Sequence, residues 1–386
     1  MRMTGWAATA AGLLLTGVAM AGPADDRRAA AIDAAAQAAM AKTGAKGLAV
    51  AIVEDGKPVL VRSYGVRNAA GAPLETDTVM YGASLTKAVF AYTVMQLVDD
   101  GKIDLDKPIA DYLPRPLPDY GNLDAYGNWG DLAGDARWRK ITPRMVLTHS
   151  TGFANFAWLE PDEKLRIHFA PGSRYAYSGE GIILLQFALE KGLGLDLGAE
   201  MQRRVFDRLG MTNTSMTWRA DFARNLADGW TEEGKTEPHD ERSRVRAAGS
   251  MDTSIADMAR FAAGLVRGEG LSAASRREMV RGQLPITTVS QFPTLQPEAP
   301  AAARPKGVAA GLGVIAFGGP QGPGFFKSGH NESTGNNMVC IERGRRCVVL
   351  LSNDVRAEGA FPALVAAALG ETGLPWRWEY PDRFKP

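Results

Sequence analysis

The sequence predicts an α/β fold of the α+β kind. One antiparallel sheet, built from N- and C-terminal segments, is flanked by helices and interrupted by an inserted, mainly helical subdomain. Two observations support this prediction: short apolar runs of strand type stand near both ends of the chain, and helical patterns fill the middle, roughly residues 85–255. Because strands bury their apolar faces against a common partner, we expect the two ends of the chain to meet in one sheet.

The element boundaries follow from local signals. An Ala-rich stretch with acidic residues at its start and Gly44 past its end predicts a helix over 25–42. The runs 47–53 and 58–64 flank an Asp55-Gly56 turn and predict a β-hairpin. The other expected elements, in chain order, are a buried helix over 84–98, a turn-rich stretch over 114–140, helices over 142–148, 181–191, 197–209 and 254–266, a surface loop over 293–307, strands over 312–317, 324–327, 337–341 and 347–352, and a helix over 359–369.

Composition limits the classes of partner. The 386 residues are 45% hydrophobic and 23% charged, which is typical of a globular protein, and the formal net charge is +1. So small a net charge argues against a nucleic-acid partner or an anionic membrane surface. We expect a small-molecule or peptide substrate, and the sequence predicts no oligomeric state.

The first 21 residues have the three-part layout of a secretory signal peptide. Met1-Arg2 is a short positive start, residues 6–19 are apolar and small, and Ala19 and Ala21 are the small residues that a signal peptidase reads. We therefore expect cleavage after Ala21, a periplasmic or secreted protein, and one folded domain over 22–386. An uncleaved N-terminal anchor is the alternative.

The only two cysteines flank a short expected turn. If Arg343-Gly344 forms a two-residue hairpin turn, Cys340 and Cys347 face each other on adjacent strands. Export provides an oxidising compartment, but this register makes them a hydrogen-bonded pair, which is a less favourable geometry for a bridge. A disulfide and two free thiols both remain open. No Cys/His cluster of metal-binding spacing accompanies them.

Ser84-Leu-Thr-Lys87 is the first candidate for catalysis. At the first turn of a helix, residues three apart lie on one face, so the two side chains are neighbours. A serine hydroxyl is a weak nucleophile until a base takes its proton, and burial favours the neutral lysine that can act as this base. The alternative is an N-capping serine with a solvated lysine. The apolar helix that follows argues against that alternative.

Two further segments carry candidate residues. Tyr177 stands on a turn ahead of an apolar helix, where its phenol can enter a cleft, have its pKa lowered by a lysine cation and share a proton transfer. Lys327-Ser328-Gly329-His330 ends an expected strand; its cation attracts a carboxylate, and Gly329 permits close backbone approach. An ordinary half-buried tyrosine and a surface strand are the alternatives.

The order and spacing of these three segments resemble the signature of serine β-lactamases and penicillin-binding proteins, in particular the class C-like branch and its related esterases. The resemblance extends to three scaffold segments, 141–152, 205–211 and 248–257, and covers residues 25–370. It implies a β-lactamase/transpeptidase-like fold and a serine hydrolase that needs no cofactor and no metal. The implied substrate is a β-lactam, a D-amino-acid peptide or a small ester.

The resemblance also implies residue roles. Ser84 is the acylated nucleophile, Lys87 and Tyr177 move the proton, and Lys327 with Ser328 binds the substrate carboxylate. The backbone N–H groups of Ser84 and His330 form the oxyanion hole.

The sequence departs from the family pattern at one position. The family's second motif usually ends in Asn, which contacts the substrate, whereas this chain has Gly179 followed by Glu180. We expect the loss of a substrate hydrogen bond and an added negative charge near the cleft.

Other classes lack their motifs. Neither Ser84 nor Ser150 stands in a Gly-x-Ser-x-Gly elbow, which argues against an α/β-hydrolase. The four histidines are scattered without metal-binding spacing. His149 reads as a core or turn histidine. Two alternatives stay open: a family carboxylesterase with little β-lactam turnover, and a non-catalytic relative that binds peptidoglycan or peptides.

Overall fold

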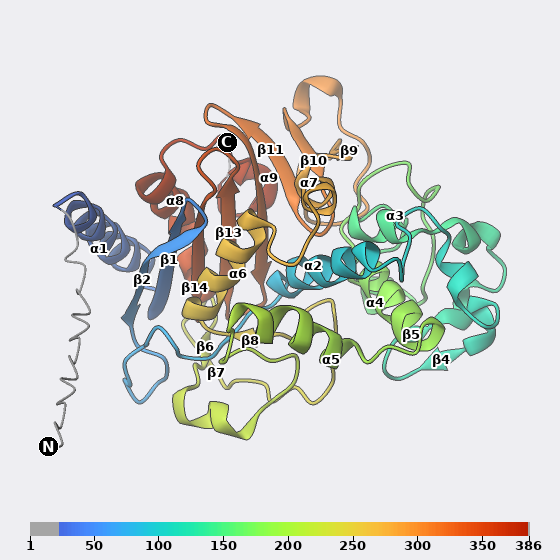
Figure 1. Ribbon diagram of the computed structural model, residues 1–386, viewed down its shortest axis with the longest axis horizontal. Coiled ribbons are helices and arrows are strands. Elements are labelled where there is room, and N and C mark those ends of the chain that lie inside the picture. The colour runs from blue at the N-terminus through green and yellow to red at the C-terminus, as the bar shows by residue number, and fades with distance from the viewer. Residues whose placement is uncertain (1–22, 385–386) are drawn as a thin grey trace, which may run out of the picture.

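The computed structural model describes residues 23–384, and these form a single sheet with helices on both faces (Figure 1). The sheet has eight strands in the order β2-β1-β14-β13-β12-β11-β10-β9, and every neighbouring pair is antiparallel. Strands from the two ends of the chain are hydrogen-bonded neighbours, because β1 pairs with β14. The predicted fold class is confirmed. The predicted signal peptide, residues 1–21, lies outside the described residues.

The bounds of the elements are as follows. The helices are α1 (Pro23–Thr43), α2 (Leu85–Asp99), α3 (Pro143–Leu147), α4 (Gly179–Phe187), α5 (Leu197–Met201), α6 (Ile255–Arg267), α7 (Ala273–Val280), α8 (Phe361–Leu369) and α9 (Trp376–Glu379). The sheet strands are β1 (Gly47–Glu54), β2 (Lys57–Gly65), β9 (Leu284–Pro285), β10 (Val308–Ala310), β11 (Ile315–Gly319), β12 (Gly322–His330), β13 (Gly335–Ile341) and β14 (Arg346–Ser352). Within the described residues, six two-residue strands form three further small sheets and pair as β3-β8, β4-β5 and β6-β7. They are β3 (Met80–Tyr81), β4 (Asn122–Leu123), β5 (Gly127–Asn128), β6 (Gly229–Trp230), β7 (Thr236–Glu237) and β8 (Asp252–Thr253).

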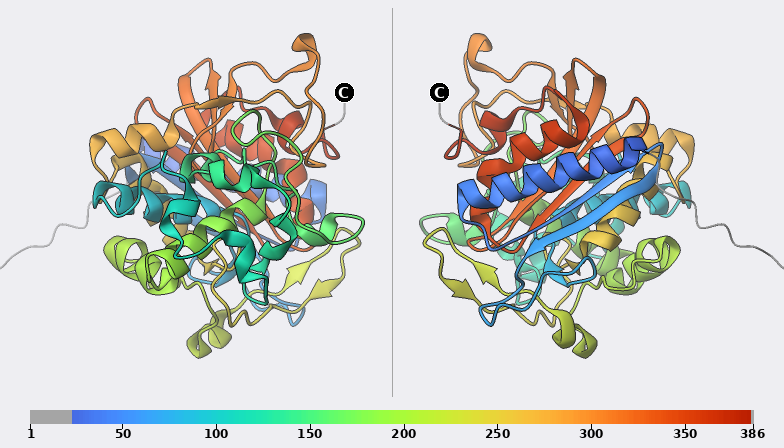
Figure 2. Two further views of the ribbon diagram at one scale, coloured as in Figure 1. Left: turned by 90° about the vertical axis from the view of Figure 1, so that its right-hand side faces the viewer. Right: turned by 90° about the vertical axis from the view of Figure 1, so that its left-hand side faces the viewer.

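The sheet is buried on both faces, and β1 shows how its sequence achieves this. Ala49 and Ala51 belong to one hydrophobic cluster, whereas Leu48, Val50 and Ile52 belong to the other. Successive side chains of a strand point to opposite faces, so an uninterrupted apolar run supplies both cores. Helices α1 and α8 lie side by side across one face (Figure 2, right), while α2 and α6 contact the other.

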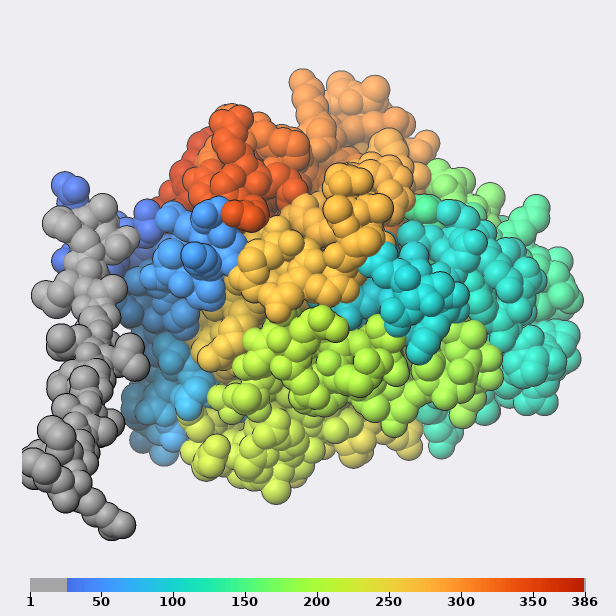
Figure 3. All heavy atoms as spheres, viewed as in Figure 1, coloured from blue at the N-terminus to red at the C-terminus, as the bar shows by residue number. Residues whose placement is uncertain are grey.

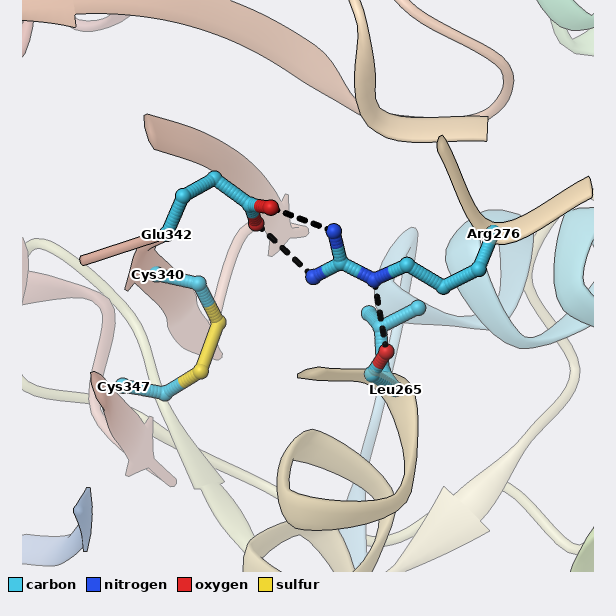
Figure 4. The surroundings of a disulfide bond; sticks show 5 residues. All are labelled: Leu265, Arg276, Cys340, Glu342 and Cys347. Carbon is cyan, nitrogen blue, oxygen red and sulfur yellow. Dashed lines mark hydrogen bonds and ion pairs between the residues drawn. A yellow bond between two sulfur atoms is a disulfide. The ribbon is translucent and has the colours of Figure 1, made fainter. Parts of the chain in front are cut away.

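The first of two hairpin turns in the sheet follows the prediction, whereas the second has four residues instead of the predicted two. Asp55 and Gly56 join β1 to β2 with φ of 48° and 72°, the left-handed pair that an Asp-Gly hairpin turn requires. Residues 342–345 join β13 to β14, and the register places Cys340 opposite Cys347. The structure contains the Cys340–Cys347 disulfide, with 4.1 Å between the Cα atoms (Figure 4). Arg276 of α7 forms an ion pair with Glu342 beside this bridge.

The middle of the chain forms the helical region. In Figure 3 the helices α6 and α7 (gold) lie between the sheet side, in blue and red, and the helical region, in cyan and green. The predicted helices 181–191 and 197–209 are each an α-helix continued by a π-helical turn. None of the described helices is long and apolar enough to cross a membrane.

Some predicted boundaries are wrong. The strand expected over 312–317 begins only at Ile315, because Gly311 donates its N–H to the Val314 carbonyl at 2.9 Å and closes a turn there. Helices α7 and α9 were not predicted. Their sequences are short and mostly polar or aromatic, and tertiary contacts rather than an apolar period hold them.

Candidate active site

Ser84 stands at the start of α2 and does not use its side chain to cap the helix. Its hydroxyl accepts no backbone N–H of the first turn; instead its Oγ lies 2.9 Å from Lys87 Nζ. Lys87 is 1% exposed and also donates to the Ala248 carbonyl at 2.5 Å. The alternative of a capping serine beside a solvated lysine is therefore excluded.

The backbone ahead of Ser84 is tightly constrained. Ala83 has φ of 48°, a conformation that costs energy for a residue with a Cβ. A Cβ at Gly82 would lie 2.9 Å from Met251 Cε and 3.0 Å from the Met251 carbonyl oxygen, so a larger residue would force Met251 to shift. The N–H groups of residues 85–87 donate to the carbonyls of residues 82–84, each at 3.1 Å. Among the described residues, the Ser84 N–H has no hydrogen-bond acceptor.

Burial controls the protonation of Lys87. Desolvation, and secondly the nearby charge of Lys327, hold the pKa of Lys87 well below its usual range. No nearby carboxylate raises the pKa of Lys87 again. A lysine in this state is a neutral amine in a larger fraction of molecules, and a neutral amine can accept the Ser84 proton.

Tyr177 reaches the same oxygen from the turn before α4. Its hydroxyl donates to Ser84 Oγ at 2.8 Å, and Lys87 Nζ lies 5.0 Å from its ring centroid. The ring packs on His149, with 4.5 Å between centroids, and His149 Nδ1 lies 3.2 Å from the Ser178 backbone N and O. His149 is thus a buried turn histidine, as expected. Its own pKa is held well below the usual value by burial and by the two lysines.

The expected effect on the Tyr177 phenol is wrong in direction. Burial raises the pKa of Tyr177, and the hydrogen bond to Ser84 opposes this only in part. A lysine cation beside the ring was expected to lower the Tyr177 pKa, but burial favours the neutral form of Lys87, and desolvation of the phenol is the largest effect. Tyr177 therefore stays protonated and is a hydrogen-bond donor rather than a base.

The end of β12 forms the opposite wall of the site. Strand β11 pairs with β12 only as far as Phe326, so residues 327–330 have no strand partner on that edge. A Cβ at Gly329 would lie 2.8 Å from the Ser84 N atom, so glycine alone lets this strand approach the start of α2. Gly329 is therefore packed directly against the backbone at Ser84, and His330 follows it in β12.

The side chains on this wall engage a carboxylate that the sequence did not reveal. Ser328 Oγ donates to Glu379 Oε1, and Gln291 Nε2 donates to Glu379 Oε2 at 2.9 Å. Burial raises the pKa of Glu379, against the opposing effects of Lys327 and the Ser328 hydrogen bond. Burial also lowers the pKa of Lys327 to about 8, although Glu379 raises it.

His330 has a second carboxylate partner. Its Nδ1 lies 3.0 Å from Glu358 Oε1, and Glu358 is also paired with Arg383 at 3.0 Å. Burial lowers the pKa of His330, but the hydrogen bond to Glu358 and the charges of Glu358 and Glu379 together outweigh it, so the net shift is upward. The His330 side chain is thus drawn toward Glu358.

One cavity of about 680 Å³ connects these groups. The predicted residues that line it are Ser84, Lys87, Tyr177, Lys327, Ser328, Gly329 and His330. Gly179 does not line it, which corrects its expected role in substrate binding. A Cβ at Gly179 would lie 2.4 Å from the Phe156 ring, which occupies that space and itself lines the cavity. Glu180 is also turned away, because its Oε1 accepts the Ala157 N–H at 2.8 Å.

An amide does reach the cavity, but from another position. Asn155 lines the cavity and its Oδ1 accepts the Gly179 N–H at 3.0 Å. Its amide nitrogen has no hydrogen-bond partner among the described residues. No sequence signal pointed to Asn155, because it lies in a loop without a motif. Sequence reasoning also missed Gln291 and Glu379, because neither stands in a motif. Across residues 23–384, no group of three or more His, Cys, Asp or Glu is placed to hold a metal ion.

The sheet flanked by helices, with serine, lysine and tyrosine meeting at one oxygen, is the architecture of the serine β-lactamase and penicillin-binding protein class. The chain matches the family described as Beta-lactamase over residues 32–370 and belongs to that family. The resemblance seen in the sequence is confirmed.

Two curated relatives are named for different reactions. Lovastatin esterase of Penicillium rubens is 29% identical over 180 residues, which cover 40% of this chain and 44% of that protein. The D-alanyl-D-alanine-carboxypeptidase/endopeptidase AmpH of Escherichia coli K12 is 28% identical over 193 residues, covering 48% and 49%. In these matches the chain spans about half the length of the curated relatives.

Solved structures agree on the fold. A penicillin-binding protein homologue from Pyrococcus abyssi superposes with a TM-score of 0.71 at 19% identity, covering 92% of this chain and 80% of that one. At this identity the likeness shows the fold alone.

Proposed function

We propose that this protein is a serine hydrolase that forms an acyl-enzyme on Ser84. One observation carries the proposal: Ser84 Oγ lies within hydrogen-bond distance of both Lys87 Nζ, at 2.9 Å, and Tyr177 OH, at 2.8 Å, and Lys87 is buried without a carboxylate partner. A buried amine of lowered pKa beside a hydroxyl is the arrangement that activates a serine nucleophile.

The geometry assigns a role to each group. Neutral Lys87 takes the proton from the Ser84 hydroxyl as Oγ bonds to the substrate carbonyl carbon. Tyr177, which remains protonated, donates to Ser84 Oγ in the resting state and can pass a proton to the leaving group. Its proton is then replaced from the Lys87 ammonium. In the second step, water gives a proton to Lys87 and attacks the acyl carbon. The Lys87 ammonium then returns that proton to Ser84 Oγ as the ester bond breaks, which restores the serine hydroxyl and releases the acid.

The oxyanion of the tetrahedral intermediate needs donors that are free before reaction. The Ser84 N–H has no acceptor among the described residues, and Gly329 packs against it. The N–H of His330, the next residue of β12, is the second donor of this proposal. Two such donors at a low-dielectric site typically account for the largest single part of the rate enhancement.

The substrate class is an acyl compound: a β-lactam, a D-amino-acid peptide or a small ester. The names of the two curated relatives support acyl transfer to water as the reaction. The acyl side of the cavity favours the carboxylesterase alternative, because Phe156 stacks on Trp158 at 4.0 Å between centroids and covers the position of the usual amide. An apolar acyl group fits this wall.

Export is part of the proposal. The disulfide between Cys340 and Cys347 supports it, since disulfides persist mainly in oxidising compartments. Cell fractionation and N-terminal sequencing test it. We expect a periplasmic or secreted chain beginning at or near Gly22, and an intact Met1 in the cytosol would contradict export.

Mass spectrometry of the intact protein tests the reaction. After brief incubation with an activated aryl ester, we expect one added acyl group, located on the peptide that contains Ser84, and no adduct in Ser84→Ala. Ser150→Ala is the matched control. The Ser150 hydroxyl is buried and bonded to the Met145 carbonyl and to Thr148, so this variant should acylate normally. An adduct on Ser150 instead would overturn the assignment.

A further inference from the structure

The wall that should bind a substrate carboxylate already contains a carboxylate of the protein. A buried chain of hydrogen bonds runs from Tyr175 OH to Gln291 Oε1 at 2.7 Å, from Gln291 Nε2 to Glu379 Oε2 at 2.9 Å, and from Ser328 Oγ to Glu379 Oε1. These four side chains are between 2% and 7% exposed. Both oxygens of Glu379 are therefore held by donors from the main body of the fold.

The hydrogen bond to Glu379 uses the only proton of the Ser328 hydroxyl. A hydroxyl has one proton to donate, and Ser328 directs it to Glu379 rather than into the cavity. Ser328 lines the cavity and Glu379 lies directly behind it. A substrate carboxylate placed against Ser328 would meet the hydroxyl's lone pairs instead of its proton.

The same carboxylate offsets the charge of Lys327. Glu379 acts on Lys327 as an opposing charge, and Lys327 Nζ itself donates to the Ser328 carbonyl at 2.6 Å. The Ser328 hydroxyl and one of the three N–H donors of Lys327 are therefore engaged from inside the protein. In a low-dielectric site, two carboxylates sharing one set of donors repel each other.

We propose that Glu379 makes this site select against substrates that carry a carboxylate on the leaving-group side of the scissile carbonyl, so that esters of uncharged alcohols or phenols are its substrate class. This inference rests on the proposed acyl-enzyme at Ser84. It places the specificity in the C-terminal helix α9, well outside the three motif segments.

The test compares two aryl acetates that differ only in a meta-carboxylate on the leaving phenol. For the wild-type enzyme we expect kcat/KM for the uncharged ester to exceed that for the carboxylated ester by at least tenfold. In Glu379→Gln, which removes the charge in either orientation of the amide, this ratio should fall by about tenfold, with the uncharged ester hydrolysed within about threefold of wild type. Where that variant is unstable, Glu379→Asp is used, because the shorter side chain withdraws from Ser328.

Two controls distinguish a specific effect of the Glu379–Ser328 hydrogen bond from a general effect of negative charge near the cavity. Glu358→Gln removes another buried carboxylate beside the cavity, one that pairs with His330 and Arg383 but not with Ser328. It should leave the ratio nearly unchanged. In the double variant Glu379→Gln with Ser328→Ala, the gain for the carboxylated ester should disappear, because the released hydroxyl is absent.

The outcomes are distinct for the two proposals. Absence of acylation at Ser84 in wild-type protein overturns the proposed function. Normal acylation with an unchanged ratio in Glu379→Gln overturns this inference and leaves the proposed function standing. An equal change of the ester ratio in Glu358→Gln also overturns the inference. The effect would then come from any nearby negative charge and not from the hydrogen bond between Glu379 and Ser328.

Discussion

Two buried lysines face the same cavity from different walls, and their surroundings differ in one respect. Lys87, at the start of α2, has a hydroxyl and a carbonyl as its hydrogen-bond partners, whereas Lys327, near the end of β12, has a carboxylate close by in Glu379. Burial lowers both pKa values, that of Lys327 only to about 8 and that of Lys87 well below its usual range. Lys87, which has no carboxylate beside it, can therefore act as a base, whereas Glu379 favours the charged form of Lys327.

The difference also explains how the two lysines act on each other. The charge of Lys327 is the second cause of the lowered pKa of Lys87. A site with only one of them would lose part of the activation of Ser84. The two walls of the cavity are therefore coupled electrostatically as well as sterically through Gly329.

Lys87→Arg should have the largest effect, because it keeps the charge and removes the capacity to act as a base. Arginine stays protonated in proteins, so we expect kcat/KM for an aryl acetate to fall by about a thousandfold or more. Single-turnover acylation of Ser84, followed by mass spectrometry, measures the chemical step directly. A loss smaller than tenfold would show that Lys87 is not the base.

Lys327→Met should shift the pH profile rather than abolish activity. Neutral Lys87 is the active form, so kcat/KM for an uncharged ester rises with pH until Lys87 is deprotonated. Removing the neighbouring cation raises the pKa of Lys87, so the midpoint should move to higher pH by up to about one unit, with up to a tenfold loss below it. A midpoint that stays in place or moves to lower pH would contradict the coupling. The double variant Lys327→Met with Glu379→Gln controls for the carboxylate left unpaired.

The parts of this cavity that the sequence predicted are those set by local rules. Ser84 and Lys87 are neighbours because of helix periodicity, and the antiparallel ladder alone brings Cys340 opposite Cys347. The sheet was predictable because the apolar run of β1 can only be buried between two layers of helices.

The missed residues depend on long-range packing. Glu379 meets Ser328 across 51 residues of sequence, and Asn155 meets Gly179 across 24. The role expected of Gly179 was wrong for the same reason: the ring of Phe156, from a distant loop, occupies the space in which an Asn side chain would stand. No local pattern encodes which loop covers a helix start.

Burial of Lys87 should lower the stability of the fold. Burial of Lys327 should lower it less, because the Glu379 carboxylate favours the charged form of Lys327. Lys87 has a lower pKa in the folded than in the unfolded chain, so between the two values unfolding takes up a proton and stability rises with pH. Lys87→Met removes this dependence but leaves the Ala248 carbonyl without its donor. The change in Tm relative to wild type should therefore be more favourable at pH 7 than at pH 10, by about 2–4 °C for each 1 kcal/mol. Equal changes in Tm at both pH values would show that the pKa of Lys87 is not lowered in the folded protein.

Asn155→Ala should have the smallest effect, because it removes a binding contact and leaves both lysines in place. The Asn155 amide nitrogen is unpaired beside the cavity, so it is placed to bind the carbonyl of an acylamino substrate. Losing one such hydrogen bond costs about 0.5–1.5 kcal/mol, roughly two- to tenfold in rate. We therefore expect kcat/KM for an acylaminoacyl ester to fall by this factor relative to a plain acetyl ester, while the pH midpoint stays unchanged. The ratio of the two esters is the readout, because loss of one of the two Asn155 acceptors of the Gly179 N–H weakens the start of α4 and lowers both rates together. An unchanged ratio in a variant with a normal pH profile would show that this wall recognises its acyl group through Phe156 and Trp158 alone.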